Sequence, residues 1–256
     1  MKLFIHSWRQ ITGNLDKFMQ ITWPLLAFGV LEAGLLATGV IGGSTADGAS
    51  GGGMGLVFAS IFISALVAIA WHRFVLRSES VGQAYAAAQS GKVWRYIGRS
   101  ILIGLILVPV GMAVILVYAL VIGPMIGLPF GTVSGETFVP GPGITPAMII
   151  AMLLVIWLSL RLSVILPGIA METPIKISES WAMTRRMNGQ IVQFVALLAV
   201  LTGLGMYIEY MLQPAQTYSF AAGVIGAIVY WFTAMLGVSA LTTLYGHLVE
   251  GRPLNA

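Results

Sequence analysis

The sequence predicts an all-α integral membrane protein, in which six transmembrane helices form three hairpins, each preceded by a cytoplasmic amphipathic interface helix. Hydrophobic residues make up 58% of the 256 positions and charged residues only 9%, whereas a soluble domain carries about 25% charged residues. Stretches of about 20 apolar residues, the length that crosses a bilayer, recur along the chain. Among the connections between these stretches, only alternate ones contain lysine or arginine. We therefore expect one polytopic membrane domain over 1–256.

Six segments are long and apolar enough to span a membrane. Pro109 and Gly111 in the third predict a kink, and Pro24 lies near the start of the first, where proline is better tolerated. The expected spans are 22–42, 55–75, 99–123, 147–169, 191–212 and 221–246.

The distribution of positive charge predicts the topology. The loops 43–54, 124–146 and 213–220 contain no Lys or Arg, whereas the N-terminal segment and the connections after the second and fourth spans contain most of them. Positive residues are retained on the cytoplasmic side of a membrane. Both termini are therefore expected in the cytoplasm, which agrees with an even number of spans.

Amphipathic segments precede the first, third and fifth spans. They are 4–18, 80–98 and 177–190, and each combines aromatic and basic residues with apolar ones at helical spacing. Such segments are typical of helices that lie along a membrane interface. The chain is then three units, each with one interface helix and one hairpin. The alternative is that any segment beside a membrane collects Trp, Arg and Ser.

Basic and aromatic side chains near the expected cytoplasmic face are candidates for contact with anionic lipid headgroups. The stretch 71–77 is either such a site or an ordinary positive end of a span with a tryptophan anchor, and the two are compatible. Small residues such as Gly223 and Gly226 are expected to let spans pack closely. The headgroup candidates are Arg73, Arg77, Arg95, Arg185, Arg186, Trp8, Trp94 and Trp181.

Two ionisable residues lie inside expected spans. Glu32 in the first and Arg161 in the fourth fall at similar depths, so an ion pair between them is geometrically feasible. An intramembrane charge is a functional candidate because it costs free energy there. One interpretation is a small transporter or channel that uses this pair. The other, which we favour, is a structural contact that fixes helix packing.

Gly48-Ala49-Ser50-Gly51 matches the Gly-x-Ser-Gly of rhomboid intramembrane proteases. A serine nucleophile needs a base within about 3 Å. His72 follows Ser50 at the far end of the second span, about 30 Å away along a helix. The other two histidines are expected on the cytoplasmic side as well. A rhomboid-like protease is therefore disfavoured, and we interpret Ser50 as part of a mobile turn.

The composition excludes several other kinds of chemistry. The chain has no cysteine, and it lacks a phosphate-binding lysine loop, a paired-histidine motif and an acidic cluster with metal-ligand spacing. Nothing predicts an enzyme, a cofactor or a metal. The net charge of +4 follows from the positive-inside distribution and does not predict nucleic-acid binding. The expected partners are membrane lipids, with protein partners or a second copy of the chain as further options.

The stretch 160–190, "LRLSVILPGIAMETPIKISESWAMTRRMNGQ", resembles a segment of the bacterial YciC-like proteins and of the membrane domain found with some glycerophosphodiester phosphodiesterases. "WHRFVLRSE" at 71–79 adds to the resemblance. It implies a bacterial inner-membrane protein, and no phosphodiesterase activity, because that soluble domain is not in this sequence. The leading expectation is a non-enzymatic inner-membrane protein that organises lipids or protein partners through its basic interface helices.

Overall fold

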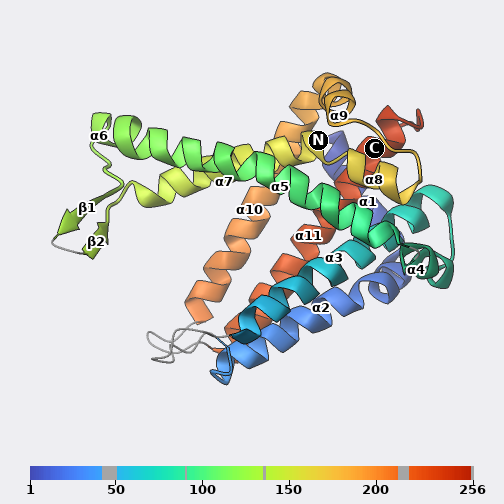
Figure 1. Ribbon diagram of the computed structural model, residues 1–256, viewed down its shortest axis with the longest axis horizontal. Helices are drawn as coiled ribbons and strands as arrows, with labels where there is room; N and C mark the ends of the chain where they lie inside the picture. The colour runs from blue at the N-terminus through green and yellow to red at the C-terminus, as the bar shows by residue number, and fades with distance from the viewer. Residues whose placement is uncertain (42–50, 90, 135–136, 213–218, 255–256) are drawn as a thin grey trace.

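The computed structural model describes residues 1–41, 51–89, 91–134, 137–212 and 219–254 (Figure 1). Within these residues six helical segments are long and apolar enough to cross a membrane, as the sequence predicts. The all-α membrane fold is therefore confirmed. The spanning helices are α2 (Leu15–Ala37), α3 (Gly51–Arg77), α5 (Lys92–Val117), α7 (Ile144–Leu162), α10 (Asn188–Leu212) and α11 (Phe220–Leu248).

The spanning helices form a closed circuit of three hairpins. Helix α2 packs on α3, α5 on α7, and α10 on α11, while α3–α5, α7–α10 and α11–α2 contacts join one hairpin to the next. Helix α11 also contacts α3 and α7. Away from the termini, α5 and α7 diverge from α2, α3 and α11 (Figure 1).

A short helix precedes each hairpin, as predicted: α1 (Lys2–Thr12), α4 (Val81–Gln89) and α9 (Ile177–Thr184). Each packs against the second span of a different hairpin, α4 on α3, α9 on α7 and α1 on α11. Helix α1 buries Leu3, Ser7 and Ile11, which lie on one face at a spacing of four residues. Helices α4 and α9 thus pack on the second span of the preceding hairpin, and α1 packs on that of the last hairpin of the chain.

Two spans begin seven residues earlier than the sequence suggests. The first was expected at 22–42, but α2 already begins at Leu15 and ends at Ala37. The third was expected from 99, but Gly91 adopts a left-handed φ of 79°, ends the preceding segment, and lets α5 begin at Lys92. The predicted interface segment 80–98 is therefore divided between α4 and the first turns of α5.

The connection between α5 and α7 contains a small hairpin that the sequence analysis did not predict. Pro109 lies inside α5, which continues through the π-helical turn η1 (Tyr118–Ile122) into α6 (Gly123–Met125). Strands β1 (Gly131–Ser134) and β2 (Thr137–Pro140) then pair antiparallel. They lie at the end of the α5–α7 hairpin that is remote from the termini (Figure 1).

Glycines set the spacing between α11 and its neighbours. A Cβ atom on Gly29 of α2 would lie 3.1 Å from the Ala227 Cβ, and one on Gly226 would lie 2.8 Å from a carboxylate oxygen of Glu209 on α10. Gly29 therefore allows α2 and α11 to approach closely, whereas Gly226 leaves room for the Glu209 side chain. Gly223 is also buried.

Candidate functional site

All positive side chains gather at the end of the bundle that holds both termini. They lie on α1, at the start of α2, at the end of α3, on the first turns of α5, at the end of α7, around α9 and in the C-terminal tail. In Figure 1 the termini, α4, α8 (Ile165–Ala170) and α9 lie at this end. The predicted asymmetry of positive charge is thus present in the fold.

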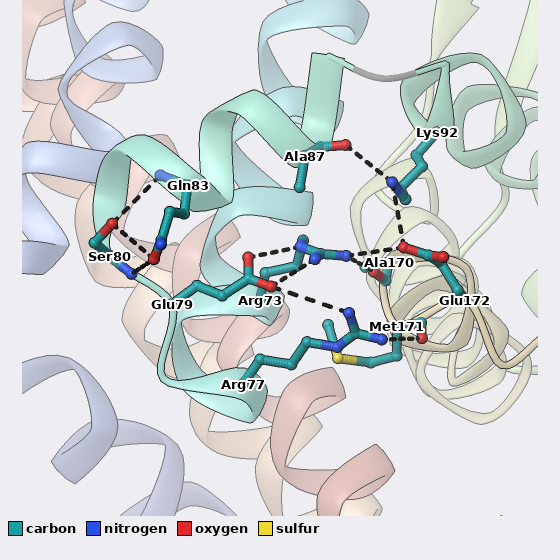
Figure 2. A network of polar contacts seen from close by, with 10 residues as sticks. All are labelled: Arg73, Arg77, Glu79, Ser80, Gln83, Ala87, Lys92, Ala170, Met171 and Glu172. Carbon is teal, nitrogen blue, oxygen red and sulfur yellow. Dashed lines mark hydrogen bonds and ion pairs between the residues drawn. The ribbon is translucent and has the colours of Figure 1, made fainter.

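Arg73, in the last turns of α3, is the centre of a polar network (Figure 2). Its side chain is only 7% exposed. Nε and Nη2 donate to the two carboxylate oxygens of Glu79, at 2.8 and 2.5 Å. Nη1 donates to the Ala170 carbonyl oxygen at 2.8 Å. A planar guanidinium suits this two-point geometry, and it ties the end of α3 to the end of α8.

Glu172 extends this network to α5. Its Oε1 lies 3.4 Å from Arg73 Nη1 and 3.3 Å from Lys92 Nζ. Hydrogen bonding to Lys92, and the charge of that ammonium group, hold the pKa of the Glu172 carboxyl below its usual range. Arg77 donates from Nη2 to the Met171 carbonyl oxygen at 2.7 Å. Five charged side chains therefore join α3, α5 and the turn after α8.

The second, fourth and sixth spans, which contain α3, α7 and α11, are each followed by a turn with a residue in the left-handed conformation. These residues are Ser78 with φ 53°, Glu172 with φ 63° and Gly251 with φ 70°. Non-glycine residues adopt this conformation at a free-energy cost. For the first two turns, the ion pairs of Arg73 offset that cost. In the third, Arg252 pairs with Glu250 at 2.6 Å and donates to the Leu76 carbonyl oxygen at 2.5 Å.

A cavity of about 1020 Å³ lies between the start of α5 and the turn after α8. Lys92, Arg95 and Arg99 line it from α5, at a spacing that places them on one helical face. Glu172 lines it from the opposite side. Arg95 and Arg99 are exposed, and in the part of the chain that the structure describes neither has a carboxylate partner. Three cations thus face one carboxylate.

The other headgroup candidates are accessible. Arg185 and Arg186 are exposed on the 3₁₀ turn after α9. Trp94 is exposed near the cavity and packs against Phe62 in a tilted arrangement, with ring centroids 5.7 Å apart. The partly exposed residues Trp8 and Trp181 lie on α1 and α9. Arg73 was expected to face lipid headgroups, but its side chain is buried and donates to protein oxygens. The Arg77 side chain is partly exposed.

The ion pair between Glu32 and Arg161, which the sequence made geometrically feasible, is not found among the described residues. The Arg161 guanidinium carbon lies 3.5 Å from the centroid of the Trp181 ring and 5.1 Å from that of Trp157. Its Nη2 donates to the Trp181 carbonyl oxygen at 3.0 Å. Arg161 lies in the last turns of α7, so its long side chain reaches the adjacent α9. Glu32 is half-buried on α2.

Ser50, the candidate nucleophile, lies outside the described residues. His72, which was considered as the base for Ser50, is fully buried. Its Nδ1 lies 2.8 Å from the Thr242 hydroxyl oxygen, and its Nε2 lies 3.3 Å from the Tyr96 hydroxyl oxygen. Among the described residues no group of His, Cys, Asp and Glu could hold a metal ion.

No protein family, curated protein or solved structure matches this chain. The resemblance to YciC-like membrane proteins therefore stays a prediction. Sequence reasoning did not single out Lys92 and Arg99 as site residues, although their three- and four-residue spacing around Arg95 is visible in the sequence. The sequence signal for this site is Gly91, because a glycine at this position ends the preceding segment and places Lys92, Arg95 and Arg99 in the first turns of α5.

Proposed function

We propose that this chain is a non-enzymatic, multi-pass inner-membrane protein that binds anionic lipid headgroups at its cation-rich end and so organises the lipids around it. One observation carries the proposal. Arg95 and Arg99 are exposed in a large cavity with Lys92, and among the described residues no carboxylate pairs with either arginine. Such charge favours an anionic ligand.

The position of these cations suits a headgroup. Lys92 and Arg99 are separated by two helical turns, which is about 10 Å along α5. They occupy the very start of a spanning helix, beside the exposed Trp94. Tryptophan is enriched at the headgroup level of membranes. A guanidinium binds phosphate through two parallel hydrogen bonds, and this supports a phosphate-bearing headgroup.

The distribution of charge supports cytoplasmic termini. Lys176 is exposed near α9, at the cationic end, whereas Val139 is exposed on β2, at the other end. Because the chain contains no cysteine, single cysteines can be placed at these two positions. We expect a membrane-impermeant maleimide added outside the cytoplasmic membrane to label Val139→Cys and to leave Lys176→Cys unlabelled. Labelling of both positions from outside would contradict this topology.

Lipid retention tests the headgroup site. The protein is purified in mild detergent, mixed with phosphatidylglycerol and phosphatidylcholine, and its bound lipid is measured by native mass spectrometry. A basic residue near a membrane surface contributes about 1 kcal/mol. The double variant Arg95→Gln, Arg99→Gln should therefore retain about 30-fold less phosphatidylglycerol, with phosphatidylcholine unchanged.

The matched control removes the same charge elsewhere. Arg185→Gln, Arg186→Gln changes two exposed arginines on the turn after α9, outside the residues that line the cavity. We expect a smaller loss of phosphatidylglycerol for this variant. Equal losses in the two double variants would mean that attraction follows the overall charge of this end, and would overturn the cavity as the binding site.

A further inference from the structure

A second cavity, of about 540 Å³, lies among α3, α5, α7 and α11. In Figure 1 the α5–α7 hairpin diverges from α3 and α11 away from the termini. Among the described residues that line it, none carries a charge, and apolar side chains alternate with hydroxyl groups. The hydroxyl-bearing residues are Ser60, Ser64, Tyr96, Ser100, Ser159, Ser163 and Tyr230.

Several of these hydroxyl groups are available to a ligand. Ser60 and Ser64 lie one turn apart on the same face of α3, and among the described residues no hydrogen-bond partner is found for either. Ser100 donates to the Tyr96 carbonyl oxygen at 2.9 Å, which leaves its lone pairs free to accept. In a bilayer such groups gain more from a polar ligand than they do in water, because no solvent competes.

A buried hydrogen-bond chain fixes the polarity of Tyr96. Thr242 donates to the Val238 carbonyl oxygen at 2.8 Å, so its oxygen accepts from His72 Nδ1, also at 2.8 Å. In a neutral imidazole with the proton on Nδ1, His72 Nε2 carries no proton and accepts from the Tyr96 hydroxyl at 3.3 Å. The Tyr96 oxygen can consequently only accept a hydrogen bond from a group in the cavity. The wall thus offers Tyr96 and Ser100 as acceptors, and Ser60 and Ser64 as donors that can rotate toward a ligand.

We propose that this cavity binds the glycerol end of an uncharged glycerolipid, such as a diacylglycerol. A charged headgroup is disfavoured, because a charge without a partner in an apolar site is costly. Hydroxyl and ester oxygens match the donors of the serines and the acceptor of Tyr96. Ile103 and Leu107, on the same wall of α5, suit acyl chains.

The surroundings favour entry from the bilayer. Leu105 and Met112 on α5 and Met148 on α7 are all more than half exposed, so the divergent hairpin presents apolar surface. A ligand that is already dissolved in lipid reaches the cavity between these helices without crossing a charged surface. This site is separate from the cationic cavity and does not depend on it.

The experiment compares retention of diacylglycerol and phosphatidylglycerol by the purified, full-length protein, using native mass spectrometry. Ser64→Leu fills the cavity, and Tyr96→Phe removes the fixed acceptor with little change in volume. Each should lower diacylglycerol retention about tenfold, because hydrogen bonds to the ligand are lost or blocked. Phosphatidylglycerol retention should not change. Leu105→Phe, on the exposed face of α5, is the matched control and should leave both lipids unaffected.

The outcomes separate the two sites. Both proposals are supported if Tyr96→Phe loses diacylglycerol alone and the double variant Arg95→Gln, Arg99→Gln loses phosphatidylglycerol alone. Unchanged diacylglycerol retention in both Ser64→Leu and Tyr96→Phe overturns the glycerolipid site, whatever the arginine variants do. An equal loss in Leu105→Phe also overturns it, because the lipid would then bind the outer surface. If Ser64→Leu lowers the melting temperature, Tyr96→Phe alone decides the question.

Discussion

Arg73 and Glu79 form a two-point ion pair around the left-handed residue Ser78, with the Arg73 Nη2 to Glu79 Oε1 distance at 2.5 Å. The pair reverses the chain immediately after α3 and lets the same guanidinium hold the Ala170 carbonyl. One buried arginine therefore makes two contacts at the joint between the first and second hairpins, to which Arg77 and Lys92 also contribute.

Removing either partner should weaken this joint. Arg73→Gln or Glu79→Gln leaves a largely buried charge without its closest partner, and breaking a buried pair typically costs about 3–5 kcal/mol. We expect a clear fall in the melting temperature of the detergent-purified protein. Glu250→Gln breaks an ion pair whose arginine is about half exposed, and should cost under about 1 kcal/mol. Equal effects at Glu79 and Glu250 would contradict the central role of Arg73.

Acid should release the contact between Glu172 and Lys92. Because the folded protein lowers the pKa of Glu172, the pairing stabilises the fold above the ordinary carboxyl pKa and is lost as the pH falls through the lowered value. The melting temperature of the wild type should fall more than that of Glu172→Gln as the pH goes from about 7 to about 3. Glu172 is 56% exposed, so about 1 M salt should reduce the difference. Identical acid curves for the two proteins would contradict this assignment.

Arg161 should act through the shape of its guanidinium as well as its charge. It stacks on Trp181 and donates to that residue's carbonyl, so Arg161→Lys keeps the charge and loses the planar contact. We expect Arg161→Lys to destabilise the protein by about 1–2 kcal/mol, measured by thermal unfolding. Arg185→Lys, at an exposed position, should have little effect. Equal stability of Arg161→Lys and wild type would show that charge alone matters.

The spans and the charged end were predictable because both depend on composition within short windows. An apolar stretch of sufficient length must become a helix in lipid, since the backbone has no other way to satisfy its hydrogen bonds. The position of Lys92 was less clear, because a single left-handed glycine, Gly91, decides where α5 begins. The packing of α1 on α11 joins opposite ends of the chain, and no local pattern indicates it.

The pairing of polar groups could not be predicted in the same way. Similar depth made Glu32 and Arg161 potential partners, but depth does not specify the direction in which a side chain points around its helix. Arg161 meets Trp181, only twenty residues later, since α9 folds back on the end of α7. The hydroxyl-lined cavity is formed by residues of α3, α5, α7 and α11 together, so it is a property of tertiary packing.

Two glycines on α10 offer the sharpest test of how α10 and α11 pack. A Cβ on Gly205 would lie 2.4 Å from Val229 Cγ1 on α11, whereas a Cβ on Gly203 would meet nothing within 4 Å. Valine is stiff at χ1 and cannot rotate away freely, so Gly205→Ala must push the helices apart. We expect it to lower the free energy of unfolding by about 1–3 kcal/mol, measured by denaturant unfolding in detergent.

Gly203→Ala is the matched control, because the chemical change and the helix are the same. It should stabilise the protein by up to about 1 kcal/mol, since alanine favours the helix and meets no neighbour. The double variant Gly205→Ala, Val229→Ala removes the atoms that clash and should recover most of the lost stability. If Gly205→Ala were as stable as Gly203→Ala, α10 and α11 could not be in the close contact that holds the last hairpin together.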